Sequence, residues 1–484
     1  MDGIICGWIA KNAYNKVYSS ALSTIIFGVS LLPHFLDLFQ EVLRTKLNSM
    51  QEKLNRQITP GLREAFLELF LEHWHPLPQP QELDSDFQVL AVDGSGGLRR
   101  YANGAFFYVA RAYGVSSTGE HFRFLDADVF LARGSGEEVR KYLTLKSEYA
   151  EIQVALEGIR RLEGEQKYLL IDGSLYGRAM HLVKEAVAEG DRDFPLRYVD
   201  AYCTLMEECR KLGVIPIGLS KDSRTRFFRN KLIETVYLTE LEQLRGLVSR
   251  EDLKTLHSCL ITLDETPSIA LSDFLRLKAK YGSILDRIDE LLFEYRREWT
   301  DFHFIMQNAQ YPGYTTPMEL GPVQRRARRR FDDIKNSPEE YLRRRFRNAI
   351  ADSENPRRLL DYGVGVLRRL LNFPTIVSFH VLLSLQDTPL RIDVPCWALG
   401  IENTMGNLTE CRFLDWEVDA LSRVIGVLLA GYAGLRNYNV WLVAADERVR
   451  LTRQDMDQVD EGLLSRALGL TLIHSRRYRR VRYP

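Results

Sequence analysis

The chain has 484 residues, more than one compact core usually holds, which suggests two or three domains. Basic and acidic residues balance at 65 each, so net charge excludes no class of partner. The 45% hydrophobic and 27% charged residues are typical of a soluble globular protein. The six cysteines include no C-x-x-C pair, which argues against a zinc ribbon and a disulfide framework and favours a cytoplasmic location.

The first unusual segment is residues 17–36, which contain no formally charged residue. Twenty residues would span a bilayer, but Ser, Thr, Tyr and Pro dilute the segment, and Asp37 follows at once. We therefore expect a buried or partner-facing amphipathic helix and do not favour a membrane protein. A membrane anchor or signal, and a start site placed too far upstream, are the alternatives.

Residues 35–75 carry leucine and phenylalanine at helical spacing, and three prolines then mark a boundary near 77–85. Three Val-, Phe- and Tyr-rich runs with short polar links follow and predict an antiparallel meander: FQVLAVDGS at 87–95, GAFFYVARAYGV at 104–115 and FRFLDADVFLAR at 122–133. Each of these strands is expected to end where its run ends.

The next elements alternate between helix and strand. A helix is expected at 136–163, a strand at 167–174 and a mostly helical stretch at 177–211, interrupted near 190–195; another strand is expected at 214–221. The order β-β-β-α-β-α-β requires parallel pairing after the meander and indicates an RNase H-like α/β core.

Residues 222–370 are charged, helical in pattern and poor in strand signals. Strands return at 375–385 and 390–399, and helices are expected at 414–430 and 440–450. The chain is thus divided into an N-terminal helical region (1–80), a first part of the core (85–225), a helical basic insertion (226–372) and a second part of the core with a basic tail (373–484).

Two predicted strands end in the same triplet, AVDGS at 91–95 and LIDGS at 170–174. Ligands of open α/β sheets gather at the carboxyl ends of strands, so Asp93 and Asp172 are expected to point at one site. Two carboxylates with no nearby base suit hard divalent cations. A single Asp-Gly pair is a common turn, but two pairs in this order favour a metal site.

Several motifs together resemble the NurA family of DNA end-processing nucleases. They are AVDGSGG at 91–97, LIDGSL at 170–175, GLSKDS at 218–223, RIDVP at 391–395 and YNVWLVAAD at 438–446, in which Asn439 stands where the family has proline. The resemblance covers about 85–225 and 375–455. It implies an RNase H-like fold, action on DNA with Mn²⁺, and a hexameric HerA-type translocase as partner. We expect a homodimer that docks on this hexamer, with residues 15–45, which are rich in large apolar side chains, forming part of one of these contacts.

The resemblance also implies the residues of the site. Asp93, Asp172 and Asp446 match metal-ligand positions, and two Mn²⁺ ions per site are expected, with Mg²⁺ as the alternative ion. Lys221 follows a predicted strand and is expected to contact a phosphate or stabilise developing charge, whereas an ordinary surface lysine is the alternative.

The family further carries a glutamate on the helix between the two DGS strands. Glu151 is the candidate, because EIQVALEGI places it at the start of an amphipathic stretch 21 residues before Asp172. Glu148 and Glu157 are its rivals on the same helix.

Arginines crowd the stretches QRRARRRF at 324–331 and YLRRRFR at 341–347. They predict either a phosphate track, with Phe331, Tyr341 and Phe346 stacking bases, or a helix face salt-bridged to acidic pairs at 332–333 and 339–340. The candidate DNA-binding residues are Arg325, Arg326, Arg328, Arg329, Arg330, Arg343, Arg344, Arg345 and Arg347. The tail at 476–482 is either a further DNA contact or a disordered end.

The predicted activity is metal-dependent hydrolysis of DNA by a two-cation mechanism, of the single-strand endonuclease and 5′–3′ exonuclease type. End resection in double-strand break repair, or defence against phage, is the expected role. No GxxxxGK[ST] motif occurs, so any ATP-driven step must come from a HerA-type partner. An RNA-directed nuclease of the same fold and a catalytically silent DNA-binding adaptor are the alternatives.

Overall fold

The computed structural model describes residues 35–54, 58–78, 87–181, 183–263, 265–322, 325–408, 410–415, 419–469 and 473. The chain divides into two compact units, Met1–Pro60 and Gly61–Pro484, and each is described by itself. In the first unit the described element is one long amphipathic helix, α2 (Phe35–Leu54).

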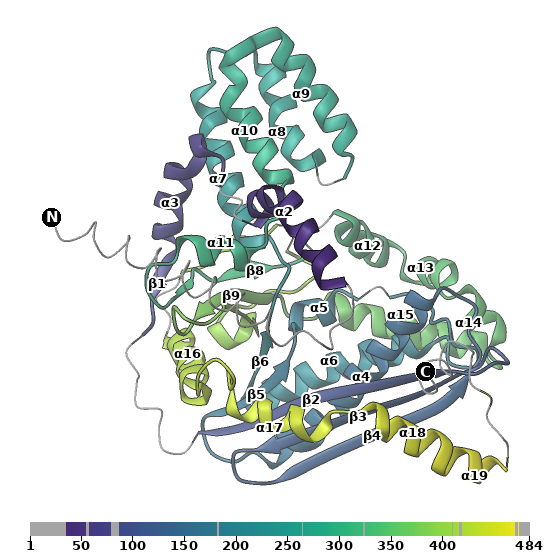
Figure 1. The fold of residues 1–484 in the computed structure, drawn as a ribbon. Helices are drawn as coiled ribbons and strands as arrows, with labels where there is room; N and C mark the ends of the chain where they lie inside the picture. The colour runs from purple at the N-terminus through teal and green to yellow at the C-terminus, as the bar shows by residue number, and fades with distance from the viewer. Residues whose placement is uncertain are drawn as a thin grey trace. The chain divides into compact units, whose positions relative to one another are not determined.

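The second unit is built on one mixed sheet, which contains eleven strands in the described residues (Figure 1). The strands are β1 (Trp74–Pro76), β2 (Gln88–Arg100), β3 (Phe106–Ser116), β4 (His121–Phe130), β5 (Lys167–Asp172), β6 (Val214–Ser220), β7 (Gly313–Thr315), β8 (Met318–Leu320), β9 (Ile376–Leu382), β10 (Leu390–Pro395) and β11 (Arg412–Phe413). Their order is β1-β7-β9-β10-β6-β5-β2-β3-β4, with β8 beside β9 and β11 beside β8.

The centre of the sheet has the predicted order. Strands β2, β3 and β4 form the antiparallel meander, and β5 and β6 add to the other side of β2 in parallel. Strand β10 then pairs antiparallel with β6, and β9 with β10. The predicted fold class, α/β with a mixed sheet of parallel and antiparallel strands, is confirmed.

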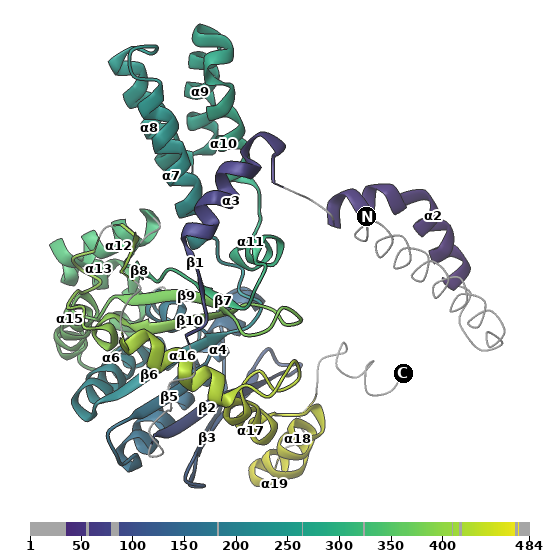
Figure 2. The same ribbon diagram turned by 90° about the vertical axis from the view of Figure 1, so that its left-hand side faces the viewer.

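Helices surround this sheet and also extend away from it. They are α3 (Arg63–Glu72), α4 (Gly136–Gly158), α5 (Leu175–Ala179), α6 (Phe194–Leu212), α7 (Phe227–Gln243), α8 (Arg250–Leu263), α9 (Pro267–Tyr281), α10 (Asp286–Arg296), α11 (Asp301–Asn308), α12 (Arg325–Asn336), α13 (Pro338–Arg345), α14 (Arg347–Asp352), α15 (Pro356–Leu371), α16 (Asp419–Gly431), α17 (Val440–Val449), α18 (Arg453–Asp457) and α19 (Ser465–Leu468). Short turns of 3₁₀- or π-helix lie at Pro60–Leu62, Ile159–Arg161, Gly282–Leu285, Cys396–Leu399 and Gln458–Leu464. Helices α7–α10 project from the sheet (Figure 2).

Alternation along the strands sends side chains to two helical layers. Val89 and Ala91 of β2 and Leu170 of β5 enter the main core together with α16 and α17. Leu90 of β2 faces the opposite way and lies beside Gly158 of α4. The two faces of β2 therefore meet different helices.

Some predicted elements are corrected by the structure. Strand β2 does not end at its Asp-Gly pair but continues to Arg100, because β3 pairs with it along that whole length. The stretch 177–211 is less helical than expected: α5 ends at Ala179 and α6 begins only at Phe194. The 222–370 stretch contributes β7 and β8 to the sheet, and β1 lies at the end of the 35–75 stretch that was expected to be helical, just before the boundary near 77–85. The four-region division of the chain stays a prediction.

Candidate functional site

The two predicted aspartates occupy matching positions on neighbouring parallel strands. The ladder between β2 and β5 ends at the pair Val92 and Ile171, and Asp93 and Asp172 are the next residues on each strand. Side chains alternate along a strand, so Asp93 points to the same face of β2 as Val89 and Ala91, which is the face covered by α17. The sheet register thus brings the two carboxylates to one place, as the repeated triplet predicts.

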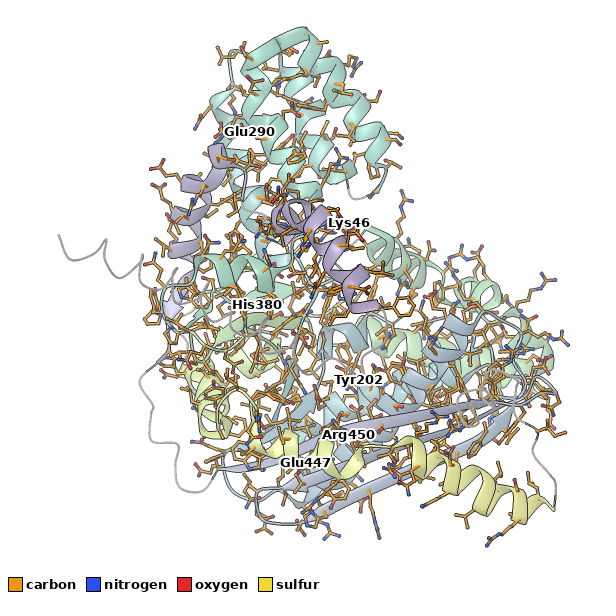
Figure 3. The ribbon with its side chains drawn as sticks, in the orientation of Figure 1. Lys46, Tyr202, Glu290, His380, Glu447 and Arg450 are labelled. Carbon is orange, nitrogen blue, oxygen red and sulfur yellow. The ribbon has the colours of Figure 1, made fainter. Side chains whose placement is uncertain are left out.

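The third predicted aspartate, Asp446, lies on α17, which packs on β2 and β3. The buried Asn439 caps the start of α17 by accepting a hydrogen bond from the Leu442 N–H at 3.1 Å. At its other end, Arg111 of β3 donates to the main-chain oxygens of Val449 at 2.8 Å and Arg450 at 2.7 Å (Figure 3 labels Arg450). Both ends of the helix that carries Asp446 are therefore fixed.

Burial and neighbouring negative charge act together on Asp93, which is 9% exposed. Burial, then the charge of Asp172 and, more weakly, that of Asp446 raise the pKa of Asp93 to about 7, although the N–H of Gly94 and the charge of Lys221 act in the opposite direction. The three aspartates are thus close enough to affect one another electrostatically.

Glu151 approaches the aspartates from the other face of β2. It lies on α4, is 6% exposed, and its carboxylate rests against Gly94: a Cβ on that glycine would lie 2.4 Å from Oε1. Burial raises the pKa of Glu151, although the guanidinium of Arg178 opposes this shift. Only a residue without a side chain at position 94 leaves room for this carboxylate beside Asp93.

The two rival glutamates of α4 are placed differently. The carboxylate of Glu148 accepts hydrogen bonds from the Tyr198 hydroxyl at 2.6 Å and contacts His181 Nε2 at 2.9 Å. Burial alone would raise the pKa of Glu148, but Arg178, His181 and Tyr198 hold it at about 2. Glu157 is exposed to solvent. Glu151 therefore has the position nearest to the aspartates, and Glu148 lies beside it along the wall of the cavity described below.

Lys221 comes directly after β6 and contacts the site. Its Nζ lies 2.8 Å from Oδ2 of Asp172 and 4.1 Å from the ring centre of Tyr438. The Tyr438 hydroxyl also donates to Asp172 Oδ2 at 3.3 Å. Lys221 is thus held between a carboxylate and an aromatic ring.

A cavity of about 470 Å³ lies next to these carboxylates. Glycines and small polar side chains form much of its wall, together with Glu148, Glu151, Asp172, Arg178 and His181. Arg178 was missed in the sequence because one arginine four residues after an Asp-Gly-Ser triplet carries no recognisable signal. His181 was also missed, because a single histidine outside any motif carries no recognisable signal either.

The fit to a metal depends on donor type and charge. In the part of the chain that the structure describes, no group of three His, Cys, Asp or Glu side chains is arranged around a metal position. Lys221 and Arg178 instead contact the carboxylates of Asp172 and Glu151. The candidate metal ligands are carboxylates from β2, β5, α4 and α17, and ligands that offer only oxygen atoms suit Mn²⁺ or Mg²⁺. The residues fit a hard divalent cation.

The arginine stretches form α12, α13 and the start of α14. Arg343 pairs with Glu339 at 2.6 Å and Arg344 with Asp333 at 2.5 Å, as the salt-bridge alternative predicts for these two. Arg330 is partly buried and donates to the main-chain oxygen of Met180 at 3.3 Å. No ion pair involves Arg329, Arg345 or Arg347 among the described residues, and all three are exposed.

The base-stacking expectation is wrong. The rings of Phe331, Tyr341 and Phe346 are only 4%, 3% and 1% exposed, because they form the inner face of these helices. The side chains of Arg325 and Arg326, most of the proposed interface at 15–45, and the tail at 476–482 lie outside the residues whose side chains are described. Among the described helices none is long and apolar enough to cross a membrane.

Comparison with known protein families identifies one match over most of the chain. A family model described as the NurA domain matches residues 87–451. The DNA double-strand break repair nuclease NurA of Pyrococcus furiosus is 25% identical over 183 residues, which cover 34% of this chain and 39% of that protein. The match thus spans about two fifths of that relative's length.

Solved structures match the chain at low identity and low TM-score. A crystal structure of NurA matches with 17% identity and a TM-score of 0.41, covering 88% of this chain and 99% of the other. A crystal structure of NurA bound to dAMP and manganese matches with 16% identity and a TM-score of 0.38, covering 91% of this chain and all of the other.

Proposed function

The chain belongs to the NurA family, and on this premise we propose that it is a metal-dependent nuclease that hydrolyses phosphodiester bonds of DNA. The observation that carries the proposal is the meeting of Asp93 and Asp172 at the end of one parallel ladder, with Asp446 within electrostatic reach. A cluster of carboxylates, of which Asp93 is buried and Asp172 and Asp446 are partly exposed, is a suitable site for divalent cations.

We assign the ligand role to Asp93, Glu151, Asp172 and Asp446. Two Mn²⁺ ions, with Mg²⁺ as the alternative, would supply an activated water and offset the charge that develops on the phosphate. Lys221 carries a positive charge beside Asp172 and is positioned to contact a phosphate oxygen of a bound DNA strand. The cavity beside the carboxylates provides room for part of that DNA strand.

We further propose that the protein acts on DNA ends, in break repair or in defence against phage, as a homodimer with a hexameric HerA-type ATPase. The name of the Pyrococcus furiosus relative supports a role in repair. The absence of a P-loop motif from the sequence supports a separate motor. We also propose a cytoplasmic location, which the cysteine content favours, and the single-strand endonuclease and 5′–3′ exonuclease type, which the family resemblance implies.

The direct test is a cleavage assay on labelled single- and double-stranded DNA with Mn²⁺, with Mg²⁺ and with EDTA. We expect cleavage with Mn²⁺ and none with EDTA. Asp172→Asn should abolish cleavage, whereas Asp361→Asn, which changes an exposed aspartate of α15, should not. Equal cleavage by wild type and Asp172→Asn would defeat the assignment. No cleavage of DNA by the wild type would favour the adaptor, and cleavage of RNA alone would favour the RNA-directed alternative.

A further inference from the structure

Arg178 connects the two elements that carry Glu151 and Asp172. Its Nη2 donates to Oε2 of Glu151 at 2.5 Å and to the main-chain oxygen of Asp172 at 3.0 Å. The Arg178 side chain is 5% exposed, and its Nη1 has no hydrogen-bond partner in the part of the chain that the structure describes. One nitrogen therefore links α4 to the end of β5.

The bond to Arg178 also determines which oxygen of Glu151 is left free. Arg178 holds Oε2, whereas Oε1 lies against Gly94, directly after Asp93 in the chain. The carboxylate is thus oriented with one oxygen toward the arginine and the other toward β2. Without the guanidinium, the flexible glutamate side chain would have no partner to keep Oε1 on the side of the aspartates.

Arg178 is itself held in place through α5. The Ser174 side chain caps this helix and donates to Oδ2 of Asp393 at 2.6 Å. The same oxygen accepts the Tyr176 N–H at 3.1 Å. Asp393 is fully buried on β10 and pairs with Arg391 at 3.0 Å. A buried ion pair on a neighbouring strand therefore fixes the short helix that presents Arg178.

We propose that Arg178 is a positioning residue, which sets the orientation of Glu151 and its spacing from Asp172 so that both carboxylates meet the same cations. This inference rests on the proposed function. It assigns Arg178 no contact with substrate, and it assigns Ser174 and Asp393 the task of holding α5.

The test compares two arginines with similar bonds. Arg229 is 1% exposed, and its Nη2 donates to the carboxylate and to the main-chain oxygen of Glu294, in the projecting helices. Arg178→Lys and Arg229→Lys both keep the charge but shorten the side chain, so neither lysine can reproduce the two-way bond. We expect both variants to lose stability to a similar extent in thermal unfolding with EDTA.

Only Arg178→Lys should weaken Mn²⁺ binding, measured by the electron paramagnetic resonance of the free ion, by about 10–100-fold, as expected for groups that orient metal ligands. At saturating Mn²⁺ its kcat should fall while KM for DNA stays within about twofold, because no substrate contact is lost. If Arg178→Lys fails to fold, Ser174→Ala provides the second variant, and a smaller decrease in Mn²⁺ affinity is expected from it.

A double-mutant cycle with Glu151→Gln completes the test. If Arg178 acts through Glu151, Arg178→Lys should cause no further loss of Mn²⁺ affinity in the Glu151→Gln background. Additive losses, or Mn²⁺ affinity in Arg178→Lys equal to that of Arg229→Lys, would overturn the positioning role while leaving the nuclease proposal intact. A wild-type protein that binds no Mn²⁺ would instead overturn both.

Discussion

Gly94 illustrates how a single residue determines the geometry of the site. Asp93 points to one face of β2, and Glu151 arrives from the other, so the residue between them must have no side chain on the Glu151 side. The strand was expected to end at this Asp-Gly pair, but Gly94 lies inside β2, which continues to Arg100. Its position in the strand is what allows two carboxylates from opposite layers to approach each other.

Gly94→Ala should therefore disturb the site without unfolding the protein. The new Cβ would meet Oε1 of Glu151 at 2.4 Å and its Cγ at 2.8 Å, so the carboxylate must move. We expect Mn²⁺ affinity to fall by about 10-fold or more. Gly365→Ala is the control, because its Cβ would meet no atom within 4 Å in an exposed helix position, and it should raise stability by about 1 kcal/mol or less. Unchanged Mn²⁺ binding in Gly94→Ala would contradict the assignment of Glu151.

Asp93→Asn should make the metal-free protein more stable. The pKa of this carboxyl is raised from 3.8 to about 7, so its ionised form is disfavoured in the folded state. The stability contributed by its protonated form is present below pH 4 and lost as the pH rises through 7. In EDTA at pH 8 the variant should therefore gain on the order of 1–4 kcal/mol in free energy of unfolding. A chemical denaturation series at pH 5 and pH 8 measures this, and a gain that does not grow with pH would count against the effect.

At this scale the sequence predicted some residues of the site and missed others. Asp93 and Asp172 were predictable because they repeat a triplet at matching places in two strands. Arg178 and Asp393 were not, because their role depends on contacts across 27 and 219 positions of chain, respectively. Glu151 could not be separated from Glu148 by pattern alone, since both lie on the buried side of α4 and only their partners differ.

Among the elements, long strands and helices were predictable and short ones were not. Strands β2 to β6 contain six or more residues with clear apolar character. Strands β1, β7 and β8 contain three residues each, too few to show a period of two. They form only because each finds a neighbouring strand: β7 and β8 pair with β9, and β1 pairs with β7. Tertiary context, not local preference, decides these strands.

Helices α12 to α14 carry a testable subset of the predicted DNA-binding arginines. Arg329 and Arg347 are exposed, and no described acidic side chain pairs with them, so they are available to phosphates. Arg329→Ala with Arg347→Ala should weaken binding equally for all DNA sequences and lower the slope of log K against log salt by about 0.9 for each lost contact. Arg343→Ala is the control, because Arg343 is paired with Glu339. The same slope in the double variant and in Arg343→Ala would reject the phosphate track.

Strand β9 contains a buried histidine that makes stability depend on pH. This residue is His380, which is labelled in Figure 3. It is 4% exposed, neither ring nitrogen has a hydrogen bond among the described residues, and Asp301 Oδ2 lies 3.9 Å from its Nε2. Burial lowers the pKa of His380 to about 4, although Asp301 opposes the shift and Arg391 adds to it. Between pH 6.5 and 4 the unfolded chain therefore binds a proton that the folded protein does not.

As the pH falls from 6.5 to 4, the free energy of unfolding should decrease by up to about 1.4 kcal/mol per pH unit because of this group. His380→Gln should remove that part of the pH dependence, whereas His257→Gln, at an exposed position of α8, should leave it unchanged. Free energies of unfolding measured from pH 7 to pH 4.5 give the comparison. Parallel curves for wild type and His380→Gln would mean that the histidine is already charged in the folded state.

At the scale of the whole molecule, the N-terminal unit has an apolar surface with no described partner. On α2, Phe35, Leu38, Phe39 and Val42 follow the spacing of one helix face and are 74%, 53%, 55% and 41% exposed. A row of large apolar side chains at this exposure is typical of an interaction surface. The prediction of an interface within 15–45 therefore has a concrete set of residues in its described part.

We expect this face of α2 to contact either the second copy of the chain or the HerA-type hexamer. Burying one large apolar side chain contributes about 1.5–3 kcal/mol, so Leu38→Asp should weaken the assembly by at least tenfold. Gln51→Asp provides the control, because Gln51 lies on the opposite face of the same helix and is exposed. Size-exclusion chromatography with light scattering, on the protein alone and mixed with the hexamer, identifies which contact is lost, while Mn²⁺ binding should be the same in both variants. If Leu38→Asp and Gln51→Asp elute as the wild type does in both experiments, this face of α2 is not an interface.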